Sequence, residues 1–189
     1  MKHLFINNMF NLNHQKMKKL VLTLAIVFAG IMSANAQGLW IGGGVGAQVE
    51  KGFTAVELAP EVGYMINDQF TVALGADYTL LHTSYGNASA LFLEPYLRYV
   101  GGTIGKKFSL FVDLCGDFGL VDADGFAVLL RPGIAWQATD NFTAAFRLGY
   151  VGYDHGFLEN MSAGGISSDN GFVMNCDLAA PQIRLYYNF

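Results

Sequence analysis

The end of the chain alternates between apolar and polar side chains, one residue at a time. From residue 182 to residue 189, Ile183, Leu185, Tyr187 and Phe189 alternate with Gln182, Arg184, Tyr186 and Asn188. A β-strand turns successive side chains to opposite faces, so this period of two predicts a strand with one apolar and one polar face. A chain built from such strands has to place the two faces in different surroundings.

The same alternation recurs along the chain and predicts eight strands. We expect them near 39–50, 54–66, 70–82, 90–100, 108–120, 126–137, 142–154 and 174–189. Hydrophobic residues make up 52% of the sequence, yet no run of 18 uninterrupted apolar residues exists. Membrane-spanning helices need such runs. The hydrophobicity is therefore distributed over short strands.

The strands and turns form an internal repeat of about one hairpin. Each of the four prolines, Pro60, Pro95, Pro132 and Pro181, lies in a similar strand context, and the first three segments lead into a polar turn, a phenylalanine and another strand. Proline removes a ladder hydrogen bond, so we expect bulges at these positions. We also expect short connections between strands 2 and 3 and strands 6 and 7, and longer ones between strands 3 and 4 and strands 7 and 8.

Ten charged residues share a face with the small residues of the strands. They are Glu57, Glu61, Asp77, Glu94, Arg98, Asp113, Asp117, Arg131, Arg147 and Arg184. A soluble barrel would turn its bulky apolar face inward, and a membrane barrel does the reverse. An eight-stranded interior is just wide enough to be filled by side chains, so the bulky face would overfill it. The sequence therefore predicts an all-β, eight-stranded antiparallel up-and-down transmembrane β-barrel.

Two further features follow from that assignment. Arg184 should face inward and pair with interior acids, the candidates being Glu57, Glu61, Glu94, Asp113 and Asp117. Aromatic residues near the strand ends should form a girdle at one membrane interface. Its members are Tyr64, Phe70, Tyr99, Phe108, Trp136, Phe142, Tyr187 and Phe189.

Residues 1–36 have the pattern of an export signal. Lys18 and Lys19 precede a short apolar segment from Leu20 to Ile31, and an Ala-Asn-Ala sequence ends at Ala36. We expect cleavage between Ala36 and Gln37, with Met17 as the true start and 37–189 as the barrel domain. That domain contains seven Lys and Arg and 15 Asp and Glu, a net charge of −8. This acidity argues against nucleic-acid binding.

The closing residues carry a resemblance to a known family. Tyr187 and Phe189 end the chain in a pattern similar to the C-terminal signal that outer-membrane barrel assembly machinery reads. With the export signal and four hairpins, 37–189 resembles the outer membrane protein beta-barrel domain family, which includes small OmpA- and OmpX-like barrels. The resemblance implies insertion into the bacterial outer membrane and contact with its lipid and with the assembly machinery. It does not specify a function.

Several functions are compatible with this architecture. The interior charges could line a selective pore, or they could neutralise one another in a structural network. His82 and Ser84 share a strand face, as an activated serine of a lipid A-modifying enzyme would require. Cys115 and Cys176 lie in no metal-binding motif, and we expect neither a metal nor another cofactor. His155 and Asp154 are interpreted as loop polarity. The favoured interpretation is a monomeric, non-enzymatic barrel with a structural or surface-interaction role.

Overall fold

The computed structural model describes residues 38–50, 53–83, 86–121, 125–156, 171–176 and 182–189. Gly38–Phe189 forms one compact unit. The expected start at Met17 and the cleavage site at Ala36 and Gln37 lie outside the described residues. So do Ser84 and Pro181, and most of the last predicted loop.

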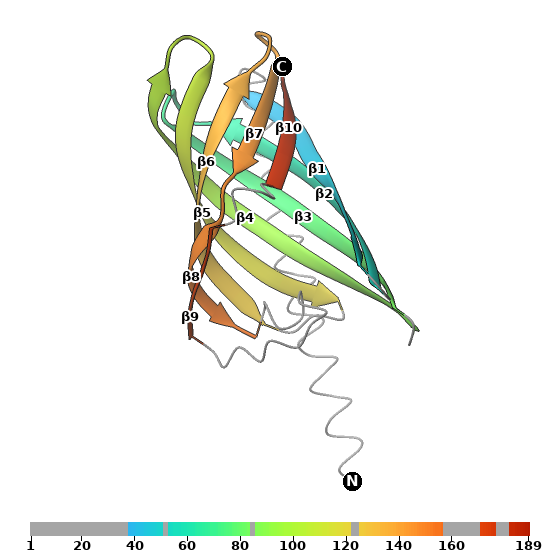
Figure 1. Cartoon of the computed structure of the whole chain (residues 1–189). Helices are drawn as coiled ribbons and strands as arrows, with labels where there is room; N and C mark the ends of the chain where they lie inside the picture. Colours follow the sequence, from blue (N-terminus) through green and yellow to red (C-terminus); the bar gives the residue numbers. More distant parts are fainter. Residues whose placement is uncertain (1–37, 51–52, 84–85, 122–124, 157–170, 177–181) are drawn as a thin grey trace. The chain divides into compact units, whose positions relative to one another are not determined.

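The described chain is built from antiparallel strands. They are β1 (Leu39–Glu50), β2 (Phe53–Met65), β3 (Phe70–Thr83), β4 (Gly86–Ile104), β5 (Phe108–Val121), β6 (Phe126–Gln137), β7 (Phe142–Arg147), β8 (Tyr150–His155), β9 (Gly171–Asn175) and β10 (Gln182–Asn188) (Figure 1). β7 and β8 are two parts of one wall strand, and β9 and β10 are two parts of the next. The ten segments therefore correspond to eight strands of the wall.

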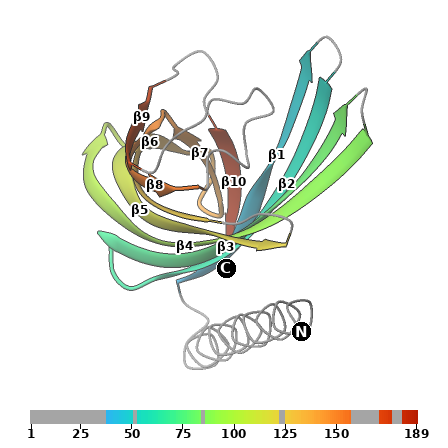
Figure 2. The same cartoon turned by 90° about the horizontal axis from the view of Figure 1, so that it is seen from below.

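The sheet closes on itself. Consecutive strands pair from β1 to β5, β5 pairs with β6, β6 with β7 and β8, and β10 joins β7 to β1. The closing pairs between the first and last strands run from Trp40↔Asn188 to Gly43↔Leu185. Viewed along its axis, the wall surrounds an interior (Figure 2). The predicted closed, eight-stranded antiparallel β-barrel is confirmed.

The two ends of the barrel differ in the connections that they carry. The turn end carries the connections at 66–69, 105–107 and 138–141 together with Phe189, and the loop end is the opposite end. The expected long connection between strands 3 and 4 is wrong. β4 begins at Gly86, and the ladder continues to Thr83↔Gly86. Backbone pairing does not need apolar side chains, so polar residues such as Asn87 can extend the hairpin.

The other strand boundaries differ in informative ways. β4 also runs on to Ile104, past a register shift between Val100 and Gly102, where a bulge lets the polar, glycine-containing end stay paired. The seventh wall strand is interrupted at Leu148 and Gly149, and the eighth begins at Gly171. The sequence indicated neither the interruption nor the earlier start.

Pro60, Pro95 and Pro132 lie near the middle of β2, β4 and β6. Around Pro60 the β2–β3 pairing keeps one register from Leu58↔Tyr78 to Glu61↔Gly75. The β4–β5 pairing likewise keeps its register from Leu93↔Phe118 to Tyr96↔Cys115, on either side of Pro95. The bulges expected at these two prolines are therefore absent, because each ring only interrupts the ladder on one side.

Pro132 behaves differently from the first two prolines. Its carbonyl accepts a hydrogen bond of 2.9 Å from the amide of Leu148, where the seventh wall strand is interrupted. The β6 register also shifts by one residue there, between Gly133↔Arg147 and Leu130↔Val151. A bulge therefore lies opposite Pro132.

Candidate functional site

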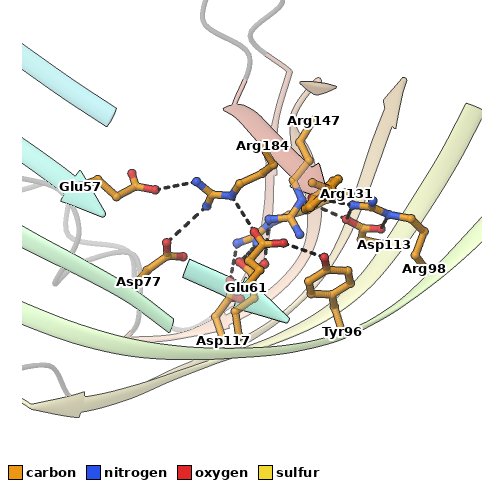
Figure 3. Close-up of polar contacts among 12 residues, drawn as sticks. Glu57, Glu61, Asp77, Tyr96, Arg98, Asp113, Asp117, Arg131, Arg147 and Arg184 are labelled. Carbon is orange, nitrogen blue, oxygen red and sulfur yellow. Dashed lines mark hydrogen bonds and ion pairs between the residues drawn. The ribbon is translucent and has the colours of Figure 1, made fainter. Parts of the chain in front are cut away.

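The ten charged residues predicted for the interior all lie on the inner face of the wall. Eight of them are buried: Glu61, Glu94, Arg98, Asp113, Asp117, Arg131, Arg147 and Arg184. Glu57 and Asp77 are half-buried. Figure 3 shows their side chains converging from opposite walls of the barrel.

One part of the network is centred on Asp113. Arg98 donates to both of its oxygens, from Nε at 2.7 Å and from Nη2 at 2.9 Å. Arg147 contacts Asp113 through Nε at 3.0 Å and Glu94 through Nη1 at 2.7 Å. Asp113 is fully buried, so these charge-assisted bonds replace its lost hydration.

Arg131 joins a third acid to this group. It forms ion pairs with Glu94 and, at 2.5 Å, with Asp117. Three arginines, Arg98, Arg131 and Arg147, thus face three acids in the middle of the barrel. The equal numbers of bases and acids allow each charge to be paired, and an unpaired charge in a dry interior is costly.

Arg184 forms a second group with acids of β2 and β3. Its guanidinium lies 2.8 Å from Glu61, 3.2 Å from Glu57 and 3.3 Å from Asp77. Glu57 and Glu61 were expected partners, whereas Asp77 was not. The other three candidates, Glu94, Asp113 and Asp117, contact different arginines, so that part of the prediction is wrong.

The position of Arg184 explains this choice of partners. β10 lies beside β1, and the inner face of β1 carries Gly42, Gly44 and Gly46. A Cβ atom on Gly44 would lie 2.4 Å from Nη1 of Arg184. The absence of side chains on β1 therefore lets Arg184 cross to β2 and β3.

Tyr96 links the two groups. Its hydroxyl donates to Glu61 at 2.7 Å. Its ring also lies 4.9 Å from the guanidinium carbon of Arg147 and 5.4 Å from that of Arg98. Trp40 and Tyr186 pack edge to face nearby, with ring centroids 4.5 Å apart. Aromatic rings therefore fill the space between the charged groups toward the turn end.

Asp154 corrects the sequence interpretation. It was interpreted as loop polarity, but it lies in β8 and is fully buried. β8 pairs Asp154 with Ala127, which in turn pairs with Asp117. A period of two continued from Phe146 would place Asp154 on the outer face. The register shift of one residue between β7 and β8 turns it inward, and the bulky Tyr153 beside it is the signal of that shift in the sequence. His155, its neighbour, is exposed.

The predicted girdle residues lie around the turn end. Cross-strand pairs join Phe70 to Tyr99, Phe108 to Trp136 and Phe142 to Tyr187, while Tyr64 pairs with Leu39. Ring centroids are 5.2 Å apart for Phe70 and Tyr99, and 5.3 Å apart for Tyr187 and Phe189. None of the eight is buried. The aromatics thus form a band on the outer face.

The sequence interpretation missed a second aromatic row, near the loop end. Phe118 pairs with Phe126, and Tyr153 pairs with Phe172. The ring of Phe126 lies 6.5 Å from Tyr153 and 5.3 Å from His155. The side chains of Phe118, Phe126, Tyr153 and Phe172 are all exposed. On β5 and β6, Phe118 and Phe126 lie ten residues from Phe108 and Trp136 of the first row, and this even spacing was a signal available in the sequence.

The remaining candidate residues do not form a catalytic or metal-binding site within the described ranges. His82 is exposed, and its proposed partner Ser84 lies outside the described residues. Cys115 is buried, Cys176 is exposed, and the two form no disulfide. Within the described ranges, no group of three or more His, Cys, Asp or Glu could hold a metal ion. The same ranges contain no helix with the length and hydrophobicity to cross a membrane.

Comparison with known proteins gave no assignment. No model of a known protein family matches the chain, and no curated protein matches it.

Proposed function

We propose that this chain is an integral β-barrel of a bacterial outer membrane, exported by residues 1–36 and inserted as a monomer by the barrel assembly machinery. Its role is structural or surface-interacting, and it is not an enzyme. The outer face supports the membrane assignment. Large apolar residues such as Leu58, Leu114 and Leu185 are each about half-exposed there. A soluble monomer rarely exposes so continuous an apolar surface.

The spacing of the two aromatic rows is the observation that carries the proposal. Phe108 and Phe118 on β5 lie ten residues apart, as do Phe126 and Trp136 on β6. At about 3.3 Å per residue, ten steps cover about 33 Å along a strand. With a tilt of about 40°, the rows lie about 25 Å apart along the barrel axis, the height of the apolar band in outer-membrane barrels.

The interior supports a structural role over a pore. Arg147, Asp113 and Glu94 cross the middle of the barrel and are almost completely buried, as is the ring of Tyr96. Side chains this well buried leave little room for a water column. A narrow porin-like channel remains the second candidate, because Glu57 and Asp77 toward the loop end are reached by solvent.

Membrane fractionation and planar-bilayer recording test the two parts of the proposal. The processed protein should fractionate with outer membranes and begin at Gln37. Purified protein in a planar bilayer should give no stable, stepwise conductance. Recovery in a soluble fraction would refute the membrane assignment, whereas regular conductance steps would favour the channel. Lipid A with unchanged acyl chains on expression would agree with a non-enzymatic role, and a change abolished by His82→Ala would contradict it.

A further inference from the structure

The turn between β4 and β5 carries the two lysines that the structure describes. Lys106 and Lys107 follow Gly105 in this turn, and both are exposed (Figure 1). The four arginines lie inside the barrel and form ion pairs with its acids. No described carboxylate forms an ion pair with either lysine. Among the described lysines and arginines, these two are therefore the ones without a counter-ion in the protein.

The hairpin around these lysines extends beyond the neighbouring strand. The β3–β4 ladder ends at Phe70↔Tyr99, whereas the β4–β5 ladder continues to Ile104↔Phe108. Every residue from 101 to 108 is exposed, although most of them lie in paired strands. The two lysines are therefore at the tip of a projecting hairpin, where a ligand can approach their side chains.

The aromatic row near the turn end lies directly beside this tip. Phe108 belongs to that row and follows Lys107 in the chain. It pairs with Ile104 on β4 and with Trp136 on β6, so the three side chains lie side by side on the outer face, where all three are exposed. Aromatic rows of membrane proteins lie at the level of the lipid headgroups. In a membrane, the ammonium groups would therefore lie at the depth of the lipid phosphates.

Backbone contacts fix the position of the turn. The amide of Gln137 donates to the carbonyl oxygen of Lys107 at 2.8 Å, so the turn is bonded to β6 as well as to its own hairpin. Gly105 has a φ of +67°, which glycine adopts readily, and this lets the turn close over three residues. A base held beside aromatic rings in this way loses less conformational freedom on binding than one in a flexible loop.

The other two connections at the turn end have the opposite charge. The connection at 66–69 contains Asp68, the connection at 138–141 contains Asp140, and neither contains a lysine or arginine. An anionic group at this end is therefore repelled by two connections and attracted by one. The charge distribution favours a single anion-binding position, at the β4–β5 hairpin.

We propose that Lys106 and Lys107 bind the phosphate of an anionic phospholipid in the leaflet at the turn end, with Ile104, Phe108 and Trp136 against its acyl chains. The proposal rests on the membrane assignment above and specifies the lipid class that this hairpin recognises. The ammonium groups donate hydrogen bonds to the phosphate oxygens and offset the net charge of the lipid. A zwitterionic lipid already carries a cation beside its phosphate and gains less from the two lysines.

Quenching of Trp136 by brominated lipids tests the proposal. Trp40→Phe leaves Trp136 as the single tryptophan of the chain. The protein is folded into phosphatidylcholine vesicles that contain a small fraction of a lipid with brominated acyl chains, either phosphatidylglycerol or phosphatidylcholine. At low salt, brominated phosphatidylglycerol should quench Trp136 with an apparent affinity about fivefold higher, the ratio that corresponds to about 1 kcal/mol for one lysine near the surface.

Two double variants and a second reporter serve as controls. Lys106→Gln with Lys107→Gln should abolish the preference for phosphatidylglycerol, whereas Lys106→Arg with Lys107→Arg should keep it. High salt should weaken it, because the ammonium groups are exposed. Phe118→Trp, with Trp40 and Trp136 both replaced by Phe, moves the reporter along β5 to the aromatic row near the loop end. There both brominated lipids should quench equally.

The outcomes separate a failure of the inference from a failure of the membrane assignment. Equal quenching of Trp136 by the two brominated lipids would overturn the inference alone. A preference that survives in the double glutamine variant, or that is equally strong at residue 118, would overturn it as well, because the lysines would not be its source. If neither brominated lipid quenched either reporter, the membrane assignment would be refuted and the inference with it.

Discussion

At the scale of single residues, Arg184 forms ion pairs with more interior acids than any other described base. Among the described residues it is the one base in ion-pair contact with Glu57, Glu61 and Asp77. The acids near the middle of the barrel are shared among three arginines. Loss of Arg184 should therefore leave carboxylates without a counter-ion, whereas Glu94 and Asp113 each contact two arginines and would keep one of them.

Arg184→Leu should lower the free energy of unfolding by about 3–5 kcal/mol, the usual cost of removing one partner from a buried ion pair. Adding Glu61→Gln should recover part of the loss, because the side chain of Glu61 is only 2% exposed. Urea titrations of folding into lipid vesicles measure both effects. Gln182→Leu, two residues away on the same strand face, is the matched control. If Arg184→Leu matched this control in stability, the network would not be stabilising.

The residue scale is also where the sequence was most informative. A period of two assigns each side chain to a face without knowledge of the strand partners, so inward-facing residues such as Arg98 and Asp113 could be identified. Which charges pair could not be predicted. Asp77 reaches Arg184 because β10 lies beside a glycine-bearing β1. That neighbour relation exists only after the barrel has closed.

At the scale of elements, Gly149 lies in the interruption between β7 and β8 and close to the backbone that follows β9. Gly149 has a φ of +147°, a region that side chains with a Cβ rarely adopt. Its added Cβ would also meet the backbone of Asn175 at 2.2 Å and that of Cys176 at 2.9 Å. A side chain at this position would therefore collide with the backbone of the neighbouring segment at Asn175 and Cys176.

Gly149→Ala should destabilise the barrel by at least about 1–3 kcal/mol, the cost of a residue held in a disfavoured backbone region. Gly102→Ala on β4 is the matched control, since its Cβ would meet nothing within 4 Å. Thermal unfolding in detergent micelles can compare the two. Equal stabilities would mean that position 149 tolerates a Cβ atom.

Element boundaries were harder to predict than faces. The polar stretch around Asn87 and Ser89 has the composition of a loop, yet both residues lie in β4, opposite His82 and Leu80. Pairing with β3 supplies hydrogen bonds to the backbone whatever the side chains are. The interruption at Gly149 was missed because the apolar alternation continues to Tyr150, and only Val151 and Tyr153 reverse it.

At the scale of the whole molecule, the two aromatic rows define a band whose centre should be more sensitive to charge than its rims. Leu114 and Phe118 both face outward on β5 and are 47% and 40% exposed. Leu114 lies near the middle of the band, and Phe118 lies in the row near the loop end.

Leu114→Arg should cost about 2–4 kcal/mol in vesicles, the value for a charge at the bilayer midplane, and Phe118→Arg only about 0–1 kcal/mol beyond its lost packing. Folding titrations into vesicles provide the measurement. Detergent micelles, which adapt to the protein surface, should reduce the difference. Equal and small costs in vesicles would argue that this face does not meet hydrocarbon.

The cross-barrel ion pairs impose an order on assembly. The first three wall strands contribute Glu57, Glu61 and Asp77, and the base that meets them, Arg184, comes 127 residues after Glu57 and 107 after Asp77. Until the final strand arrives, a growing sheet holds negative charge that favours water over a dry interior. Arrival of that strand brings the base that contacts all three acids and closes the wall in one event. An incomplete chain would therefore remain hydrated along its inner face. These charged side chains would become buried only once the final strand has been added.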